Sequence, residues 1–399
     1  MKPLRTLVLA LAAALALLVI GAVGYEHSVS SRMDRLLASK GLPANARRLP
    51  ADPSLLSRLE ELGRQLDSAV GAPGDTLPDG GVPGAPWQWK PEQAASLDAL
   101  VVDAERVLAE LEAFLASPEV QVILESSNSF IGREAVAPKL MRLRHWTNVL
   151  SGCALASARR GETEVAAKYL RNACELTRLV DDRSTIGIMI CQGVLSITFD
   201  AASRIITQFP GSAASVRASI DPFLKDHAKE GEAKRAFLSE LRQFFEQVRE
   251  ARSSTTFSKR IAAARDISPL LESMELLARH DFDPPPSDPH HQLDSQIGIL
   301  ASLVKSEEEF RRRTTLLRIA LALCVTRERT GDWPDDLQQL APLLGRIVPL
   351  DPNLDQPWSY EVQSEKLVLT LADPIRTPKV DTASPYLLCE FRWQMREER

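Results

Sequence analysis

The chain has 399 residues, enough for two or three domains with buried cores. Its hydrophobic (44%) and charged (25%) fractions are typical of a globular protein and argue against a disordered chain. The formal net charge of -5 argues against a general nucleic-acid-binding protein, which would carry a basic surplus. Five widely spaced cysteines form no CxxC pair and no Cys/His ligand pattern, so neither a zinc site nor a disulfide framework is indicated.

The N-terminus carries the clearest signal of location. Lys2 and Arg5 precede an uncharged apolar stretch, residues 6–24, whose length suits a helix crossing a bilayer. A cleavable signal peptide is the alternative, because residues 22–24 (Ala-Val-Gly) loosely fit a cleavage site. The apolar run is longer than the core of a usual signal peptide. The sequence therefore favours an uncleaved anchor in residues 1–24 and a single-pass membrane protein with an extracytoplasmic (periplasmic) domain.

Residues 25–92 are expected to hold a juxtamembrane helix and a linker. Asp52 and Pro53 suit the start of a helix, and Gly71 suits its end. Leucines at positions 55, 59, 62 and 66 fall on one face of this helix. Residues 71–92 are dense in Gly and Pro, which favours a loop.

Residues 93–305 read as a helical domain. Apolar residues recur at helical spacing over 137–160, 162–180, 184–208, 212–229, 231–252, 257–280 and 293–329. Strand-like alternation of useful length is missing from this pattern. The fold class predicted for the chain is therefore mainly α: a membrane helix, a multi-helix bundle and a small C-terminal α+β module.

One segment of the bundle resembles a tetratricopeptide hairpin. The small and large residues that carry the spacing are Leu150, Cys153, Ala154, Gly161, Ala166, Leu170 and Ala173. Small residues at these positions let two antiparallel helices approach closely. Only one copy is visible in the sequence, and such arrays need at least three repeats for stability. A close-packed helical hairpin inside a larger bundle is therefore the favoured interpretation.

Two charged clusters invite a functional interpretation. The segment 280–294 contains His280, Asp281, Asp283, Asp288, His290, His291 and Asp294, which are metal-ligand types. Their spacing matches no metal motif, so a solvated interhelical loop is favoured. In residues 306–315, three glutamates at 307–309 stand four residues before three arginines at 311–313. This spacing predicts i,i+4 ion pairs on a solvated helix face rather than an anion site.

Motifs for catalysis are missing from the sequence. It contains no GxSxG, phosphate loop or GxGxxG, and no cysteine has an activating context. The acidic pairs Asp181-Asp182 and Asp335-Asp336 suit the first turns of helices. We therefore assign no catalytic, cofactor-binding or metal-binding residue and expect no cofactor.

Residues 306–399 form the C-terminal module. Gly331 is placed to end the long helix, and Trp333-Pro334 turns the chain into a short helix with Leu337 and Leu340 facing inward. The segments WSYEV and KLVLTL read as an antiparallel hairpin, and residues 386–393 offer a third strand. Together they predict a three-stranded antiparallel sheet covered by a helix.

This arrangement resembles the soluble part of type II secretion major pseudopilins over about residues 310–375, under a fifth of the chain. The matching residues are Gly331, Trp333, Pro334, Leu337, Pro349, Asp351, Pro352, Pro357, Trp358 and Tyr360. Two features depart from the family. Residues 353–356 replace its glycines, and the N-terminus lacks a pilin processing site, so polymerisation through that helix is not implied. The whole arrangement is similar to uncharacterised membrane-anchored bacterial helical proteins, a likeness that supplies no activity.

These observations favour a non-catalytic interaction or scaffold protein of the cell envelope. The alternatives are an extracytoplasmic hydrolase whose site is not visible as a motif, and a small-ligand binder. The expected partners are the membrane, through residues 6–24, and an envelope protein, with no nucleic acid. We also expect the Trp333 ring to pack near Leu321, Val325, Tyr360 and Leu369, at a cost of about 3 kcal/mol on truncation. An exposed Trp333 used as a docking anchor is the alternative.

Overall fold

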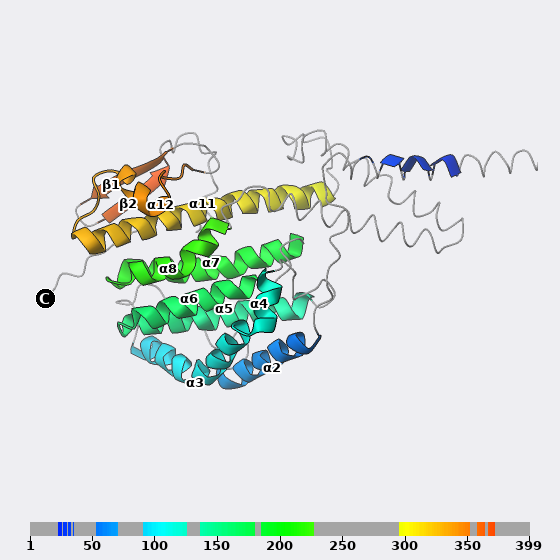
Figure 1. The fold of residues 1–399 in the computed structure, drawn as a ribbon, viewed down its shortest axis with the longest axis horizontal. Helices are drawn as coiled ribbons and strands as arrows, with labels where there is room; N and C mark the ends of the chain where they lie inside the picture. The colour runs from blue at the N-terminus through cyan, green and yellow to red at the C-terminus, as the bar shows by residue number, and fades with distance from the viewer. Residues whose placement is uncertain are drawn as a thin grey trace, which may run out of the picture. The chain divides into compact units, whose positions relative to one another are not determined.

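The structure is a computed structural model of the chain. It describes residues 53–70, 91–125, 136–179, 185–226, 295–351, 357–363 and 366–371, and parts of 23–35. Most of these residues are helical, which confirms the mainly α prediction (Figure 1). The helices are α2 (Pro53–Val70), α3 (Pro91–Leu115), α4 (Pro118–Glu125), α5 (Val136–Arg159), α6 (Thr163–Thr177), α7 (Thr185–Gln208), α8 (Ala213–Asp226), α11 (Ser295–Thr330) and α12 (Ala341–Leu344), with a short 3-10 helix, η3 (Leu337–Leu340).

The described helices lie close to the ranges expected from periodicity. The five expected helices from 137–160 to 212–229 and at 293–329 begin and end within a few residues of the observed ones. Those expected at 231–252 and 257–280 lie outside the described residues, as does nearly all of the apolar segment 6–24.

The chain divides into two compact units. One comprises Met1–Arg47, Arg183–Thr185 and Gly231–Lys305, and the other comprises Arg48–Asp182, Ile186–Glu230 and Ser306–Arg399. The second unit combines residues from the expected segments 25–92, 93–305 and 306–399, and its last stretch begins at Ser306, where a boundary was expected. Within it, α2 and the C-terminal half of α11 bury their apolar faces in the same core.

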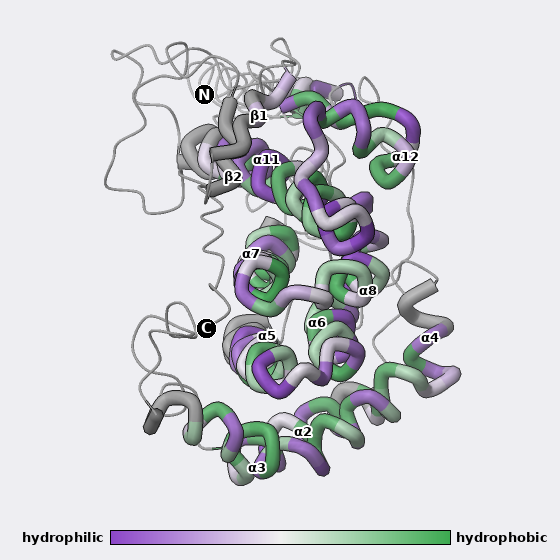
Figure 2. The backbone as a smooth tube through the Cα atoms, turned by 90° about the vertical axis from the view of Figure 1, so that its left-hand side faces the viewer, coloured by the Kyte–Doolittle hydropathy of each residue, from purple (hydrophilic) through white to green (hydrophobic). Residues whose placement is uncertain are grey.

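The helices of the second unit lie in layers, as Figure 2 shows. Helix α2 packs on α3, α3 on α5, α5 on α6, and α6 on α8. The leucines expected on one face of α2 (Leu55, Leu59, Leu62 and Leu66) are all buried in the common core. On the other side of the stack α11 contacts α7, where the rings of Phe199 and Phe310 stack with their centroids 5.8 Å apart. A single cluster of buried side chains runs through these layers.

Two consecutive helical hairpins in this stack have matching dimensions. Helices α5 and α7 both have 24 residues, and α6 and α8 have 15 and 14. The turns contain Gly161 and Gly211, which stand 50 residues apart and have φ angles of +80° and +85°. The same offset of 50 relates four buried pairs: Ala166 and Val216, Leu170 and Ile220, Ala173 and Phe223, and Cys174 and Leu224. The second hairpin therefore repeats the register of the first.

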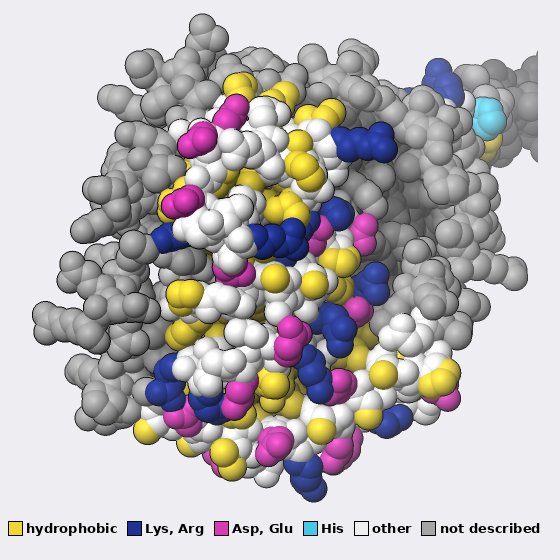
Figure 3. All heavy atoms as spheres, turned by 60° about the vertical axis from the view of Figure 1, so that its left-hand side comes forward, with side chains coloured by type: hydrophobic (Ala, Val, Ile, Leu, Met, Phe, Trp, Pro, Cys, Tyr) yellow, Lys and Arg dark blue, Asp and Glu magenta, His cyan; other side chains and the backbone are white. Residues whose placement is uncertain are grey.

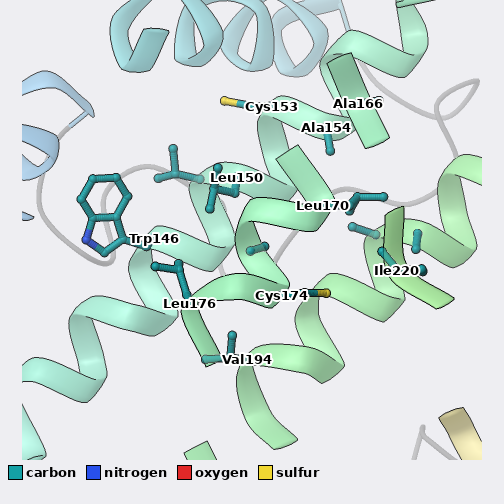
Figure 4. Close-up of a cluster of buried hydrophobic side chains, with 14 of the residues drawn as sticks. Trp146, Leu150, Cys153, Ala154, Ala166, Leu170, Cys174, Leu176, Val194 and Ile220 are labelled. Atoms are coloured by element: carbon teal, nitrogen blue, oxygen red, sulfur yellow. The ribbon is translucent and has the colours of Figure 1, made fainter. Parts of the chain in front are cut away.

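The first hairpin owes its close packing to small side chains. Figure 4 shows Leu150, Cys153, Ala154, Ala166, Leu170 and Cys174 in its buried cluster. On the α3 side, Gly152 leaves so little room that an added Cβ would lie 2.9 Å from Cδ2 of Leu100. Larger residues at these positions would separate the helices, because protein interiors have few voids to absorb added volume.

Among the described residues, one helix is long and apolar enough to cross a membrane. It spans Gly187–Gln208 within α7, and over half of it is buried inside the protein. Cys191, Leu195, Phe199, Ala202 and Ile206 belong to the common core. A helix with apolar residues on most of its faces is typical of a bundle interior as well as of a membrane. Burial in the bundle accounts for the composition of α7.

Helix α11 has two buried faces between residues 310 and 325. Phe310, Leu317, Leu321 and Val325 join the core shared with α5 to α8. Leu316, Ile319, Ala322 and Leu323 join a second cluster with Leu337, Leu340, Leu344, Val348 and Trp358. This explains why the segment TTLLRIALALCV is apolar almost all round. The helix is therefore common to the bundle and to the C-terminal elements.

The C-terminal elements described are η3, α12 and two strands. Strands β1 (Trp358–Gln363) and β2 (Lys366–Leu371) pair antiparallel, with Trp358 opposite Leu371 and Gln363 opposite Lys366. Leu337 and Leu340 are buried, as expected from the sequence. The third strand expected at 386–393 lies outside the described residues.

Candidate functional site: the C-terminal module on α11

The metal-ligand types in segment 280–294 lie outside the described residues. Within the described part of the chain, no three His, Cys, Asp or Glu side chains come together as a metal site would require. The thiols of Cys153, Cys174 and Cys324 are buried and unpaired. Burial raises the pKa of all three thiols, that of Cys153 to about 12. They are therefore protonated and poorly nucleophilic at neutral pH.

The residues singled out by the C-terminal motif do come together. Gly331 ends α11 with a φ of +85°, which favours glycine, and its N–H donates to the carbonyl of Arg327 at 2.8 Å. Two residues later, Trp333 packs against both the bundle core and the module cluster. The guanidinium carbon of Arg327 lies 4.5 Å from the centroid of the Trp333 ring, a cation–π contact. The turn thus fixes the module against the end of α11.

Two aromatic residues of β1 hold proline carbonyls. The Tyr360 hydroxyl donates to the Pro334 carbonyl at 2.8 Å, and Nε1 of Trp358 donates to the Pro349 carbonyl at 3.0 Å. The carbonyls of Pro334 and Pro349 lie outside helices and strands, so they have no partner from regular secondary structure and can accept from these side chains. Burial, and secondarily Asp335, raise the pKa of Tyr360 to about 12. Tyr360 therefore remains a hydrogen-bond donor across the physiological pH range.

Asp351, in the Pro-x-Asp-Pro part of the motif, is fully buried. Its Oδ2 lies 3.1 Å from Nε of Arg312 on α11, whose side chain is 17% exposed. The sequence predicted that Arg312 belongs to a solvated face paired with Glu308. That prediction is wrong for Arg312, because its partner is the buried carboxylate of Asp351, 39 residues later. Glu307, which was expected on the same solvated face, is buried as well. A contact at such separation leaves no trace in local spacing.

Three further contacts, which join the start of α8 or α8 itself to α11 and the C-terminal module, were not visible in the sequence. The carboxylate of Glu328 accepts hydrogen bonds from the backbone N–H groups of Gly211 (2.8 Å) and Ala213 (3.0 Å), and so caps α8. On the same helix, Arg217 donates to the carbonyl of Leu343, and Arg318 pairs with Asp221 at 3.4 Å. Charged side chains far apart in the sequence thus join α8 to α11 and to the C-terminal module.

The polar groups of the motif therefore have partners within the protein, and we assign them to packing. The exposed residues of the module include charged ones such as Asp335 and Arg346, together with two large apolar side chains: Ile347 is 75% exposed and Leu350 is 42% exposed. Both follow Arg346, a non-glycine residue with a φ of +88° that costs some strain. Asp336 caps η3 by accepting from the Gln338 N–H at 3.0 Å, as expected for the acidic pair at 335–336.

Truncation of Trp333 should destabilise the module. The ring is partly buried, less than the core position expected from the sequence, so Trp333→Ala should cost about 2 kcal/mol through lost packing and the lost contact with Arg327. Urea unfolding followed by circular dichroism measures this loss. Trp333→Phe, which keeps most of the packing, should lose less than half as much. An unchanged unfolding midpoint for Trp333→Ala would instead favour a docking role for the ring.

Comparison of the chain with models of known protein families, with curated proteins and with solved structures finds no match.

Proposed function

We propose that the chain is a non-catalytic scaffold or interaction protein of the cell envelope, held to the membrane through residues 6–24. The observation that carries the proposal is the repeated register of the hairpins α5–α6 and α7–α8, followed by α11. Stacked helical hairpins present extended surfaces, and proteins built from them commonly bind other proteins. We interpret the two hairpins as tetratricopeptide-like.

The C-terminal residues support a pseudopilin-like module in this proposal. Seven motif residues contribute to it: Gly331, Trp333, Pro334, Leu337, Asp351, Trp358 and Tyr360 all serve the junction between α11, η3 and β1. We propose that residues 386–393 add a third strand beside β1 and β2. Such a module would hold the last helix of the stack in place and present its exposed Ile347 and Leu350 to a partner.

The surface of the described helices is compatible with a protein partner. Figure 3 shows basic and acidic side chains interspersed over one face of the molecule. Nucleic acids and other polyanions bind to large patches of positive charge. Among the described residues of this face, acidic and basic side chains are mixed and form no such patch. We therefore propose an envelope protein as the partner.

Photo-crosslinking in intact cells tests the partner. A photoreactive residue replacing Ile347, which is 75% exposed in the C-terminal module, should give a discrete crosslinked product. The same residue replacing Val102, 71% exposed on α3, is the matched control and should give none, or a different product. If both positions give no discrete product, while the protein is present and folded, the scaffold role fails. A deep pocket with converging carboxylates in an experimental structure would favour a hydrolase instead.

The location is tested separately. A reporter enzyme that is active only outside the cytoplasm, fused after residue 399, should be active in cells. A stable but inactive fusion would place the domain in the cytoplasm and contradict the proposed topology.

A further inference from the structure

One buried polar contact lies outside everything assigned above. His145 of α5 is 4% exposed, and its Nε2 lies 3.6 Å from Oδ1 of Asp67 on α2. That distance is too long for a normal hydrogen bond. Both atoms are buried and have no hydrogen-bond partner among the described residues. The same is true of Oε1 of Gln65, two residues before Asp67 on α2. An ionisable side chain is thus enclosed in a helix–helix interface with its Nε2 atom unsatisfied there.

Asp67 is the charged group that acts on His145, and several other charged side chains on the helices packed against α5 pair elsewhere. On α2, Asp67 acts on His145, while Glu61 pairs with Arg64 on the exposed side. On α3 and α6, Asp98 pairs with Arg159, Glu112 with Lys168, and Glu175 with Arg178. Asp67 is therefore the one charged group among these that opposes the cost of placing a positive charge on His145.

We propose that His145 and Asp67 form an acid-sensitive latch, in which protonation of His145 loosens α2 from α5. Helix α2 is the first helix of the second unit, and it sits at the edge of the layered stack. It can therefore open without disrupting α6, α8 or α11. The latch rests on this contact alone and does not depend on the proposed scaffold role.

The direction of the effect follows from proton linkage. Burial lowers the pKa of His145, and the nearby Asp67 offsets only part of that lowering. When α2 opens, water reaches the imidazole and its ordinary pKa of about 6.5 is restored. The open state then binds more protons than the closed state below that pH. Acidification therefore favours opening, by up to about tenfold per pH unit for one proton.

Hydrogen exchange on the full chain in detergent micelles tests the latch. After correction for the intrinsic exchange rate, amides of α2 (53–70) should open more often at pH 5.5 than at pH 7.5, by up to about tenfold. Amides of α6 (163–177) are the internal reference and should change little. Equal protection of α2 at both pH values would overturn the proposal.

Two variants separate the latch from general acid instability. His145→Gln should make the opening of α2 independent of pH over this range. Asp67→Asn should increase the acid response, because the carboxylate that offsets the burial cost is removed. If His145→Gln does not fold, Asp67→Asn still decides: a smaller acid response than in the unmodified chain would contradict the latch. An acid response in His145→Gln equal to that of the unmodified chain would do the same.

Discussion

Replacement of Leu321 by alanine is expected to lower the free energy of unfolding by about 3–4 kcal/mol. Leu321 is fully buried on the α11 face that completes the core with α5 to α8. Truncation there removes packed methyl groups and leaves a cavity that the surrounding helices can only partly fill. Denaturant unfolding followed by circular dichroism gives the change in midpoint and slope.

Ile319 provides the matched control for Leu321. It is equally buried, two residues away, but its cluster is that of the C-terminal module. Ile319→Ala should therefore expose amides of η3 and α12 in hydrogen exchange before those of α6 and α8, whereas Leu321→Ala should weaken the bundle first. If the amides of η3, α12, α6 and α8 lose protection in the same order in both variants, the two faces of α11 do not belong to two separate clusters.

Replacement of Asp351 by alanine should cost about 3 kcal/mol. The change leaves the guanidinium group of Arg312, itself 17% exposed, beside a buried site without its carboxylate. Removing one partner of a buried ion pair is strongly destabilising because the other charge stays poorly solvated. Thermal and urea unfolding both report the loss.

The double variant Arg312→Met with Asp351→Leu tests this explanation. Replacing both charges by apolar side chains of similar size should recover much of the lost stability. Glu61→Ala, which breaks the exposed pair with Arg64, is the surface control and should cost less than about 1 kcal/mol. A double variant no more stable than Asp351→Ala would show that the loss comes from the backbone of the motif rather than from the unpaired arginine.

Local signals in the sequence predicted the ends of helices well. Gly331 ends α11 with a positive φ, Asp336 caps η3, and Leu337 and Leu340 face inward, each as expected. These features depend on backbone conformation and on spacing within a few residues. A single sequence is sufficient for that kind of inference.

Long-range partners could not be predicted in the same way. Glu328 caps a helix that begins 115 residues earlier, at Ala213. The carboxylate that holds Arg312 stands 39 residues beyond it, past two turns. Nothing in the local pattern distinguishes these side chains from solvated ones. The same limit applies to His145, which lies 3.6 Å from Asp67 of a separate helix.

The two helices of the second hairpin were predicted, but its repetition of the first hairpin's register was missed, for a physical reason. In the first hairpin, alanine and cysteine at the buried positions produce a recognisable pattern. In the second, Ile220 and Phe223 occupy the positions equivalent to Leu170 and Ala173, so the volumes differ although the register is the same. The two hairpins share the positions of their turn glycines and of their buried residues. A resemblance in sequence also requires side chains of similar size at those positions, and these differ.

The position of α11 has a consequence for the order in which the chain can fold during synthesis. The ribosome completes α8 at residue 226 but reaches Phe310, the partner of Phe199, only 84 residues later. At typical elongation rates this interval lasts roughly 4 to 17 s. Throughout it, the apolar side of α7 that will face α11 has no partner from α11. Emerging chains should therefore need a chaperone that shields apolar helices until α11 has left the ribosome.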